Sequence, residues 1–192
     1  RVRSKPIGEL KCELQRLSDA GFAEVVLVGI NLSAYGTDIG LSICDAVELA
    51  DRMNFRRVRL GSLEPDHITD EVIDRLAKLP SFCPQFHISL QSGCNNTLKA
   101  MNRHYSAEEY FELCQKLRAS FPEVTITTDI MVGFPTESEE DFAENVRFAQ
   151  KIGFEKVHVF PYSPREGTKA AKMPQIEKAI KEKRSHIMIE KT

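Results

Sequence analysis

The sequence predicts an α/β fold with mostly parallel strands, arranged as a partial, open β/α barrel. A strand–turn–helix unit recurs roughly every 30 to 35 residues, which is typical of βαβ connections. Each predicted strand also ends in small or polar residues, as is usual where an α/β protein binds a ligand. The 192 residues, 42% of them hydrophobic, suit one domain with a sizeable core.

The predicted elements alternate along the chain. Strands are expected at 24–30, 57–61, 86–91, 124–130 and 156–161. Helices are expected at 6–20, 41–53, 69–79, 106–119 and 138–152, with a short turn or helix near 95–102 and a last helix after Pro174. Five parallel strands are too few for a closed eight-stranded barrel. Because the chain opens on a helix, we expect the first strand of the sheet to precede Arg1.

Composition limits the function classes. The net charge of -2 and the pI of about 6.3 exclude a global basic field, so contact with nucleic acid must be local or come from another domain. There is no apolar run of membrane-spanning length and no signal peptide, so we expect a cytoplasmic protein without a membrane partner. The sequence does not indicate an oligomeric state.

The five cysteines are widely spaced, and no pair shows C-x-x-C spacing. An odd count of this kind argues against a disulfide framework and favours a reducing compartment. The spacing also lacks a local metal motif, so no metal ligand is predicted within this chain. His87 and His158 are interpreted as hydrogen-bonded interior residues rather than metal ligands.

The segment 127–142 is the most informative one. It reads as a strand that ends in Gly133-Phe134-Pro135 and runs directly into a helix. Gly133 would let a ligand approach the backbone closely. Ser138, followed three residues later by Asp141, predicts a helix cap with early acidic residues.

Polar or small residues stand at every strand end. They are Gly29 and Asn31, Ser62 and Glu64, Gln91 and Ser92, Asp129 and Gly133, and Tyr162 and Arg165. Side chains alternate along a strand, so His87, Ser89 and Gln91 should lie on the same face of their strand. That face should line a polar interior that holds a ligand. Two alternatives stay open: Asn31 and Asp129 could only cap or turn the chain, and Glu64-Pro65 could be an ordinary turn.

Taken in order, these segments resemble the radical S-adenosylmethionine domain of the methylthiotransferases over nearly the whole chain. The runs that carry the resemblance are 2–6, Asn-Leu-Ser-Ala-Tyr-Gly at 31–36, Ser-Leu-Glu-Pro at 62–65, 87–93, Met-Asn-Arg at 101–103, 128–135 and 158–163. Two of them, 31–36 and 62–65, look most like the bacterial branch that acts on threonylcarbamoyladenosine in tRNA. The branches acting on isopentenyladenosine in tRNA, or on a ribosomal protein, are less similar there.

The departures from the family are informative. The family's C-x-x-x-C-x-x-C loop is absent and would lie just upstream of Arg1. An upstream domain with three further cysteines and a C-terminal RNA-binding domain are also absent, so residues 1–192 are expected to be a radical SAM core fragment, inactive alone. Thr136 stands where the family usually has Gly, which makes that loop less flexible.

The resemblance implies a transferase. It implies S-adenosylmethionine and two [4Fe-4S] clusters, whose ligands lie outside this chain. A reduced cluster would cleave S-adenosylmethionine to a deoxyadenosyl radical that removes hydrogen from the adenine ring of tRNA, and a second cluster would supply a methylated sulfur. The cofactors do this chemistry, while the protein binds and positions them.

The resemblance also suggests roles by position. Gly29 and Asn31 would lie near the methionine amino group, and Ser62 and Glu64 would bind ribose hydroxyls or that amino group. Gln91 and Ser92 would lie near the ribose or methionine part. Gly133, Phe134 and Pro135 would hold the adenine, helped by backbone up to Tyr162. No catalytic residue is certain, but Asp129 and Arg165 are candidate neighbours of the substrate or of the second cluster.

Two rival functions remain, and one further interpretation concerns the tail. An α/β-barrel lyase or aldolase would need a Schiff-base lysine or a phosphate site inside the barrel, and no strand end offers an interior lysine. A non-catalytic binding module is the other rival. In the tail, Lys178, Lys181, Lys183 and Arg184 are interpreted as a solvated helix face that could also touch phosphate.

Overall fold

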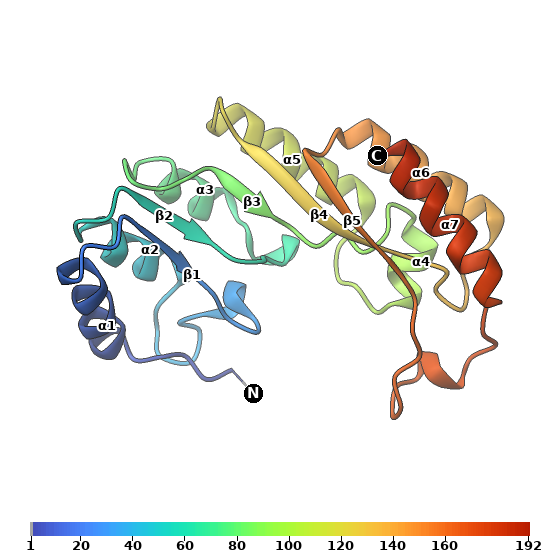
Figure 1. Ribbon diagram of the computed structural model, residues 1–192, viewed down its shortest axis with the longest axis horizontal. Helices are drawn as coiled ribbons and strands as arrows, with labels where there is room; N and C mark the ends of the chain where they lie inside the picture. The colour runs from blue at the N-terminus through green and yellow to red at the C-terminus, as the bar shows by residue number, and fades with distance from the viewer. Residues whose placement is uncertain (1) are drawn as a thin grey trace. The chain divides into compact units, whose positions relative to one another are not determined.

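The structure, a computed structural model, describes residues 2–192. The chain divides into two compact units, one made of Arg1–His87 and Lys116–Thr125 and the other of Ile88–Gln115 and Ile126–Thr192. Figure 1 traces the elements of both units in chain order.

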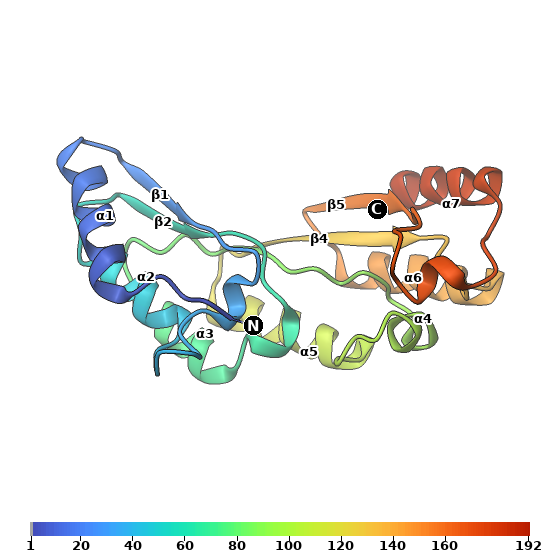
Figure 2. The same cartoon turned by 90° about the horizontal axis from the view of Figure 1, so that it is seen from below.

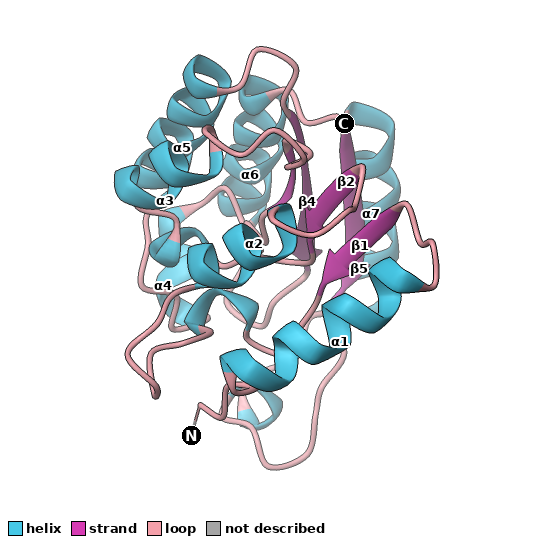
Figure 3. Cartoon of the chain, turned by 90° about the vertical axis from the view of Figure 1, so that its left-hand side faces the viewer, coloured by secondary structure: helices cyan, strands magenta, loops and turns pink. Residues whose placement is uncertain are grey.

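The first unit contains three strands and three complete helices. The strands are β1 (Glu24–Leu27), β2 (Arg57–Leu60) and β3 (Gln85–His87), and the helices are α1 (Ile7–Asp19), α2 (Ile43–Asp51) and α3 (Asp70–Leu76). Two 3₁₀ turns, η1 (Leu32–Ala34) and η2 (Pro65–His67), follow β1 and β2. β1 and β2 pair in parallel from Glu24↔Arg57 to Leu27↔Leu60, and Val58 bridges in parallel to Phe82. Figure 3 distinguishes these strands from the helices by colour.

The core of the first unit follows from the alternation of side chains along its strands. Val25 and Leu27 on β1, like Val58 and Leu60 on β2, are buried. The opposite face of the first strand is open, since Val26 is 43% exposed and Val28 is 74% exposed. Phe82, Phe86 and Phe121 pack with ring centroids 5.4 to 6.0 Å apart and close the core.

The second unit is built on two parallel strands. They are β4 (Thr125–Val132), which begins at the boundary of the units, and β5 (Lys156–Pro161), paired from Thr127↔Lys156 to Val132↔Pro161. The helices are α4 (Asn95–Ala100), α6 (Glu139–Ile152) and α7 (Lys178–Lys191), with a 3₁₀ turn η3 (Ala170–Lys172). Helix α5 (Ala107–Ser120) also begins in this unit, and its residues from Lys116 onward belong to the first. α7 contacts both β5 and α6 (Figure 2).

Local sequence explains where α6 begins and ends. The Ser138 side chain accepts a hydrogen bond from the Asp141 N–H, and the Asp141 carboxylate accepts one from the Ser138 N–H, which completes a capping box. Gly153 ends the helix in the left-handed conformation, with φ of 65°. The predicted Ser138 cap is therefore confirmed.

The predicted α/β class with parallel strands is confirmed, and every predicted element is present. Two strands are shorter than predicted. The strand predicted at 24–30 ends at Leu27 and is followed by η1 from Leu32, and the strand predicted at 86–91 ends at His87. The last helix starts at Lys178, and η1, η2 and η3 were not predicted. Within residues 2–192, no helix is long and apolar enough to cross a membrane.

Candidate functional site

The end of β1 leads into a polar loop in the first unit. The Asn31 side-chain oxygen accepts a hydrogen bond from the Ala34 N–H at 3.2 Å and caps η1. One alternative left open by the sequence, a capping role for Asn31, is therefore realised. Asn31 remains exposed, as does Gly29, so both still face solvent.

Glu64 follows β2 and is joined to the β1 loop. Its backbone N–H donates a hydrogen bond to the Ser33 Oγ at 2.8 Å. Within residues 2–192 the Glu64 carboxylate has no hydrogen-bond or ion-pair partner, and the neighbouring Ser62 is exposed. An uncommitted carboxylate beside exposed hydroxyl and amide groups can accept hydrogen bonds from an ammonium group or from ribose hydroxyls.

A cluster of polar side chains lies at η2. The ligand atoms of Glu64, which precedes η2, and of Asp66 and His67 on it lie within 4.8 Å of one another. Exposed acidic groups commonly gather in this way without a metal, and no further observation points to one.

A surface hollow lies against the β1 loop. It is lined by Val2, Arg3, Ser4, Gly29, Ile30, Asn31 and Tyr35. The Gly36 N–H donates to the Ser4 Oγ at 2.8 Å, and the Tyr35 hydroxyl donates to the Lys5 carbonyl at 2.9 Å. These bonds hold the N-terminal segment against the loop. Gly29 and Asn31 thus share one hollow in the first unit.

Gln91 has a strained backbone in the second unit. Its φ is 66°, a left-handed value that is uncommon for a residue other than glycine. Its N–H donates to the Asp129 carbonyl and its own carbonyl accepts from the Met131 N–H, both at 2.9 Å, so two bonds to β4 hold this conformation. Strain of this kind clusters at ligand sites, and it adds support that the sequence pattern could not supply.

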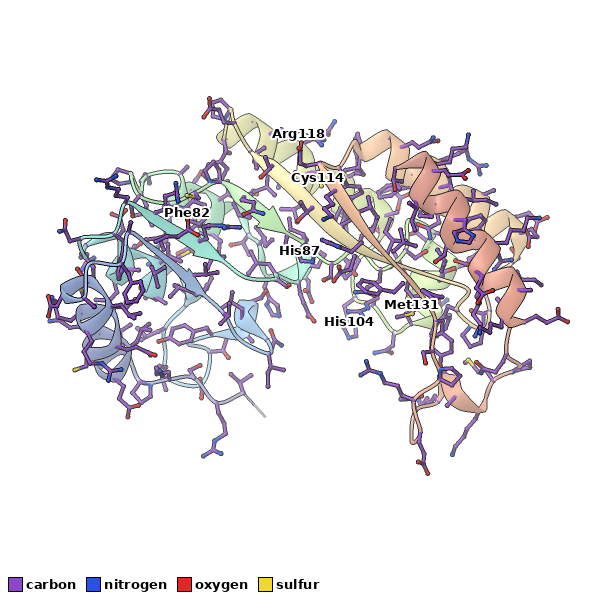
Figure 4. The ribbon with its side chains drawn as sticks, in the orientation of Figure 1. Phe82, His87, His104, Cys114, Arg118 and Met131 are labelled. Atoms are coloured by element: carbon purple, nitrogen blue, oxygen red, sulfur yellow. The ribbon has the colours of Figure 1, made fainter. Side chains whose placement is uncertain are left out.

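The other predicted residues near β4 differ in exposure. Ser92 is fully buried, and its Oγ accepts a hydrogen bond from the Cys94 N–H at 3.2 Å, so its hydroxyl serves the turn before α4. Asp129 is half-buried on β4, the strand on which Figure 4 labels Met131. Arg165 is exposed in the loop after β5, where its carbonyl accepts from the Thr168 hydroxyl at 2.8 Å.

The Gly133–Pro135 turn is closed by hydrogen bonds. The Gly133 N–H, at φ of 72°, donates to the Glu137 Oε2 at 2.7 Å, and the Phe134 carbonyl accepts from the Glu137 N–H at 2.8 Å. The Tyr162 N–H donates to the Val132 carbonyl at 2.9 Å and fixes the end of β5 beside the turn. The structure therefore places the predicted residues that follow β4, Gly133–Pro135, beside the predicted Tyr162 that follows β5.

The Phe134 ring is buried against Tyr162. Their centroids lie 5.3 Å apart with the planes at 72°, and Phe134 is only 5% exposed. The ring thus shapes the turn from inside, while the backbone of the turn is what remains for contact with a ligand. Tyr162 is also buried, and its hydroxyl has no hydrogen-bond partner among the described residues.

Sequence reasoning missed a buried ion pair beneath this turn. Glu137 Oε2 lies 2.7 Å from Arg184 Nη1, and their side chains are 0% and 5% exposed. Burial raises the pKa of Glu137 even though the Gly133 N–H and Arg184 oppose that rise. The interpretation of the tail as a solvated face is wrong for Arg184, because the Glu137 carboxylate and carbonyl draw its guanidinium inward. It holds for Lys178 and Lys183, which are exposed.

The strand ends thus offer carboxylate, amide, hydroxyl and backbone groups around glycine turns. This donor set fits an amino acid head group and a ribose in the first unit, and it fits a planar base beside the turn in the second. The same set, on parallel strands of an α/β fold, is the arrangement of a cofactor-binding enzyme core. Residues 1–149 match the family model of the radical SAM superfamily, and the chain belongs to that superfamily. Its members use S-adenosylmethionine and [4Fe-4S] clusters.

Curated relatives refine the comparison. The chain is 38% identical over 174 residues to the threonylcarbamoyladenosine tRNA methylthiotransferase MtaB of Thermotoga maritima, covering 90% of this chain and 40% of that protein. It is also 38% identical over 194 residues to the tRNA-2-methylthio-N(6)-dimethylallyladenosine synthase of Thermoanaerobacter sp., covering 99% of this chain and 41% of that protein. The chain therefore spans about two-fifths of the length of these relatives.

Solved structures support the fold. Coproporphyrinogen III oxidase HemN of Escherichia coli, described as a radical SAM enzyme, matches with a TM-score of 0.66 at 17% identity, over 90% of this chain and 40% of that one. The archaeal Methanocaldococcus infernus Elp3 matches with a TM-score of 0.58 at 18% identity, over 87% of this chain and 44% of that one. At these identities the likeness shows the fold alone.

Proposed function

We propose that this chain is the radical SAM core of a methylthiotransferase that modifies tRNA in the cytoplasm. In the complete protein it would insert a methylthio group into threonylcarbamoyladenosine next to the anticodon. The observation that carries the proposal is the 38% identity to the Thermotoga maritima enzyme across 90% of the chain. The cluster-binding loop, an N-terminal methylthiotransferase domain and a C-terminal RNA-binding domain would lie outside residues 1–192.

The residues of the first unit would hold the amino acid end of S-adenosylmethionine. The carboxylate of Glu64 has no partner among the described residues, so it can accept hydrogen bonds from an ammonium group or from a ribose diol. Asn31 and Ser62 are exposed at neighbouring strand ends and add an amide and a hydroxyl. Gly29 leaves the backbone open beside them.

The residues of the second unit would hold the ribose and the adenine. Gln91 stands at a strained position fixed by two backbone bonds to β4, so the direction in which its side chain leaves the backbone is defined. The backbone of Gly133–Pro135 offers hydrogen-bonding groups of the kind that recognise a base edge. Asp129 and Arg165 remain candidates for contact with the tRNA or the second cluster.

S-adenosylmethionine, bound with a reduced [4Fe-4S] cluster, would supply the radical that removes hydrogen from the adenine of the substrate. The part of this chain is to bind the cofactor, orient its ribose and exclude water around it.

A second substrate branch is supported by a specific observation. The Thermoanaerobacter sp. synthase named for dimethylallyladenosine has the same 38% identity to this chain, and the match covers 99% of this chain. The candidate runs 31–36 and 62–65 favour the threonylcarbamoyladenosine branch.

The test is mass spectrometry of tRNA nucleosides from a host that lacks the complete parent gene, with and without that gene restored. A methylthio group gained on threonylcarbamoyladenosine supports the proposal. A gain on the isopentenyl-type nucleoside would keep the reaction and change the substrate. No gain on any nucleoside would refute the tRNA assignment and direct attention to a ribosomal protein.

A further inference from the structure

We propose that helix α7 positions the Gly133–Pro135 turn for cofactor binding through Arg184, which acts on the turn by way of Glu137. The inference rests on the proposed function, because it concerns the turn expected to hold the adenine. Arg184 is a positioning residue in this account, since it contacts Glu137 and not the cofactor.

The first step of the argument is the bridge that Glu137 makes. Its Oε2 accepts the Gly133 N–H at 2.7 Å and lies 2.7 Å from Arg184 Nη1. The same Nη1 donates to the Glu137 backbone carbonyl at 2.9 Å. One carboxylate oxygen therefore joins the first residue of the turn to a helix that lies 47 residues further along the chain.

Lys181, one turn earlier on α7, makes a second link. Its Nζ donates to the Tyr162 carbonyl at 3.1 Å, at the end of β5. Its aliphatic stem covers Gly133 so closely that a Cβ on Gly133 would overlap the Lys181 Cγ and lie 2.9 Å from its Cδ. α7 thus contacts both segments expected to enclose the adenine, Gly133–Pro135 and the end of β5.

The energetics favour positioning over simple stabilisation. Both charges of the pair are buried, and within the described residues Glu137 Oε1 and Arg184 Nε have no hydrogen-bond partner. Buried pairs that are incompletely hydrogen-bonded often stabilise a protein no more than apolar residues of similar volume. Such a pair is better explained by the position in which it holds the Glu137 carboxylate. That position fixes the direction of the Gly133 N–H, which donates to Glu137 Oε2.

The experiment uses the complete protein with its clusters reconstituted, and it compares Arg184→Met with Lys178→Met. Lys178 lies on the same helix and is exposed, and among residues 2–192 it pairs only with Glu182, at 3.6 Å. Its replacement therefore removes one charge without touching the turn. Two quantities are measured: the hydrogen-exchange rates of the backbone amides of 133, 134, 136 and 137 without ligand, and the Kd for S-adenosylmethionine. Arg184→Met should raise the exchange rates and the Kd about tenfold, the factor for losing one charge-assisted hydrogen bond. Lys178→Met should change neither.

A double variant separates positioning from folding. Glu137→Gln with Arg184→Met leaves an acceptor for the Gly133 N–H and removes both buried charges, so the melting temperature should recover toward wild type. The Kd should stay high, because the link to α7 is still missing. Recovery of the Kd together with the melting temperature would overturn the inference, as would wild-type exchange at 133–137 in Arg184→Met.

The failure of the two proposals can be told apart. If the wild-type protein does not bind S-adenosylmethionine, the proposed function fails at this site, and with it the cofactor role assigned to α7. The exchange measurement needs no ligand and decides separately whether Arg184 orders the turn.

Discussion

Replacing Gly133 by alanine should destabilise the second unit for two separable reasons. Gly133 has φ of 72°, where a residue with a Cβ is disfavoured by about 1–2 kcal/mol. The new methyl group would also overlap the Lys181 stem, whose displacement would break the hydrogen bond from its Nζ to the Tyr162 carbonyl. A bond of this kind contributes about 1 kcal/mol, so the total loss should be about 2–3 kcal/mol.

The two contributions can be measured with a double-mutant cycle. Lys181→Ala removes the Cγ and Cδ that the methyl group would meet and leaves a Cβ at 3.2 Å. In that background Gly133→Ala should cost only the conformational part, about 1–2 kcal/mol, so the interaction energy between the two sites should be about 1 kcal/mol. Denaturant unfolding followed by tyrosine near-ultraviolet circular dichroism suits the purpose, because the chain has no tryptophan and Tyr105, Tyr110 and Tyr162 all lie in the second unit.

An equal cost of Gly133→Ala in both backgrounds would refute the packing of Lys181 over the glycine. A cost near zero in the Lys181→Ala background would refute the left-handed conformation as well. Gly153→Ala is a matched control, since Gly153 also has positive φ but a Cβ there meets nothing within 4 Å. It should cost the conformational part alone, whatever stands at position 181.

Three further predictions concern other residues. Although burial alone would raise it, hydrogen bonds from Ser138, Asn96 and Cys94 hold the pKa of Asp141 at about 2. This pKa lies below the unfolded value near 3.9, so the ionised carboxylate should add about 2 kcal/mol to the free energy of unfolding at neutral pH. That contribution should be lost as the pH falls from about 4 to 2. Asp141→Asn should remove this pH dependence when stability is measured across an acid titration. Gln91→Gly should relieve the strain of the left-handed backbone and raise the free energy of unfolding in urea by about 1 kcal/mol. It should also weaken the binding of S-adenosylmethionine by the complete enzyme. A loss of stability would contradict the strain. Glu64→Ala should weaken the same binding about tenfold, with the adjacent Asp66→Ala as a control that leaves it unchanged.

Much of the fold was predictable because local rules and burial agree along this chain. Ser138 and Asp141 are a capping pair that functions within four residues of sequence, and the alternation of Ile126, Thr128 and Ile130 with polar neighbours gives the buried face of β4. Strand ends were less predictable. Gln91 adopts a left-handed backbone that no propensity favours, and just before it the Leu90 N–H donates to the Thr128 Oγ1 instead of to a backbone carbonyl of β4.

The candidate site was predictable where a residue's role depends on its place at a strand end. Glu64 and Gln91 were identified in this way, and their positions after β2 and β3 follow from the order of elements. The burial of Ser92 could not be predicted, because it depends on a turn that draws its hydroxyl toward the Cys94 N–H. Arg184 was missed for a similar reason: on its own helix it looks like one more exposed cation, and its partner Glu137 is 47 residues away.

The position of Arg184 bears on why the turn keeps a buried carboxylate. An uncharged Gln at 137 would still accept the Gly133 N–H, so the turn itself does not require the charge. The charge is required only to draw a guanidinium from α7 beneath the turn, at the cost of burying both groups. A helix that is recruited in this way makes the conformation of the turn depend on its docking. The coupling between residues 133 and 181 therefore measures, through the packing of the Lys181 stem, the same dependence that Arg184 and Glu137 create through an ion pair.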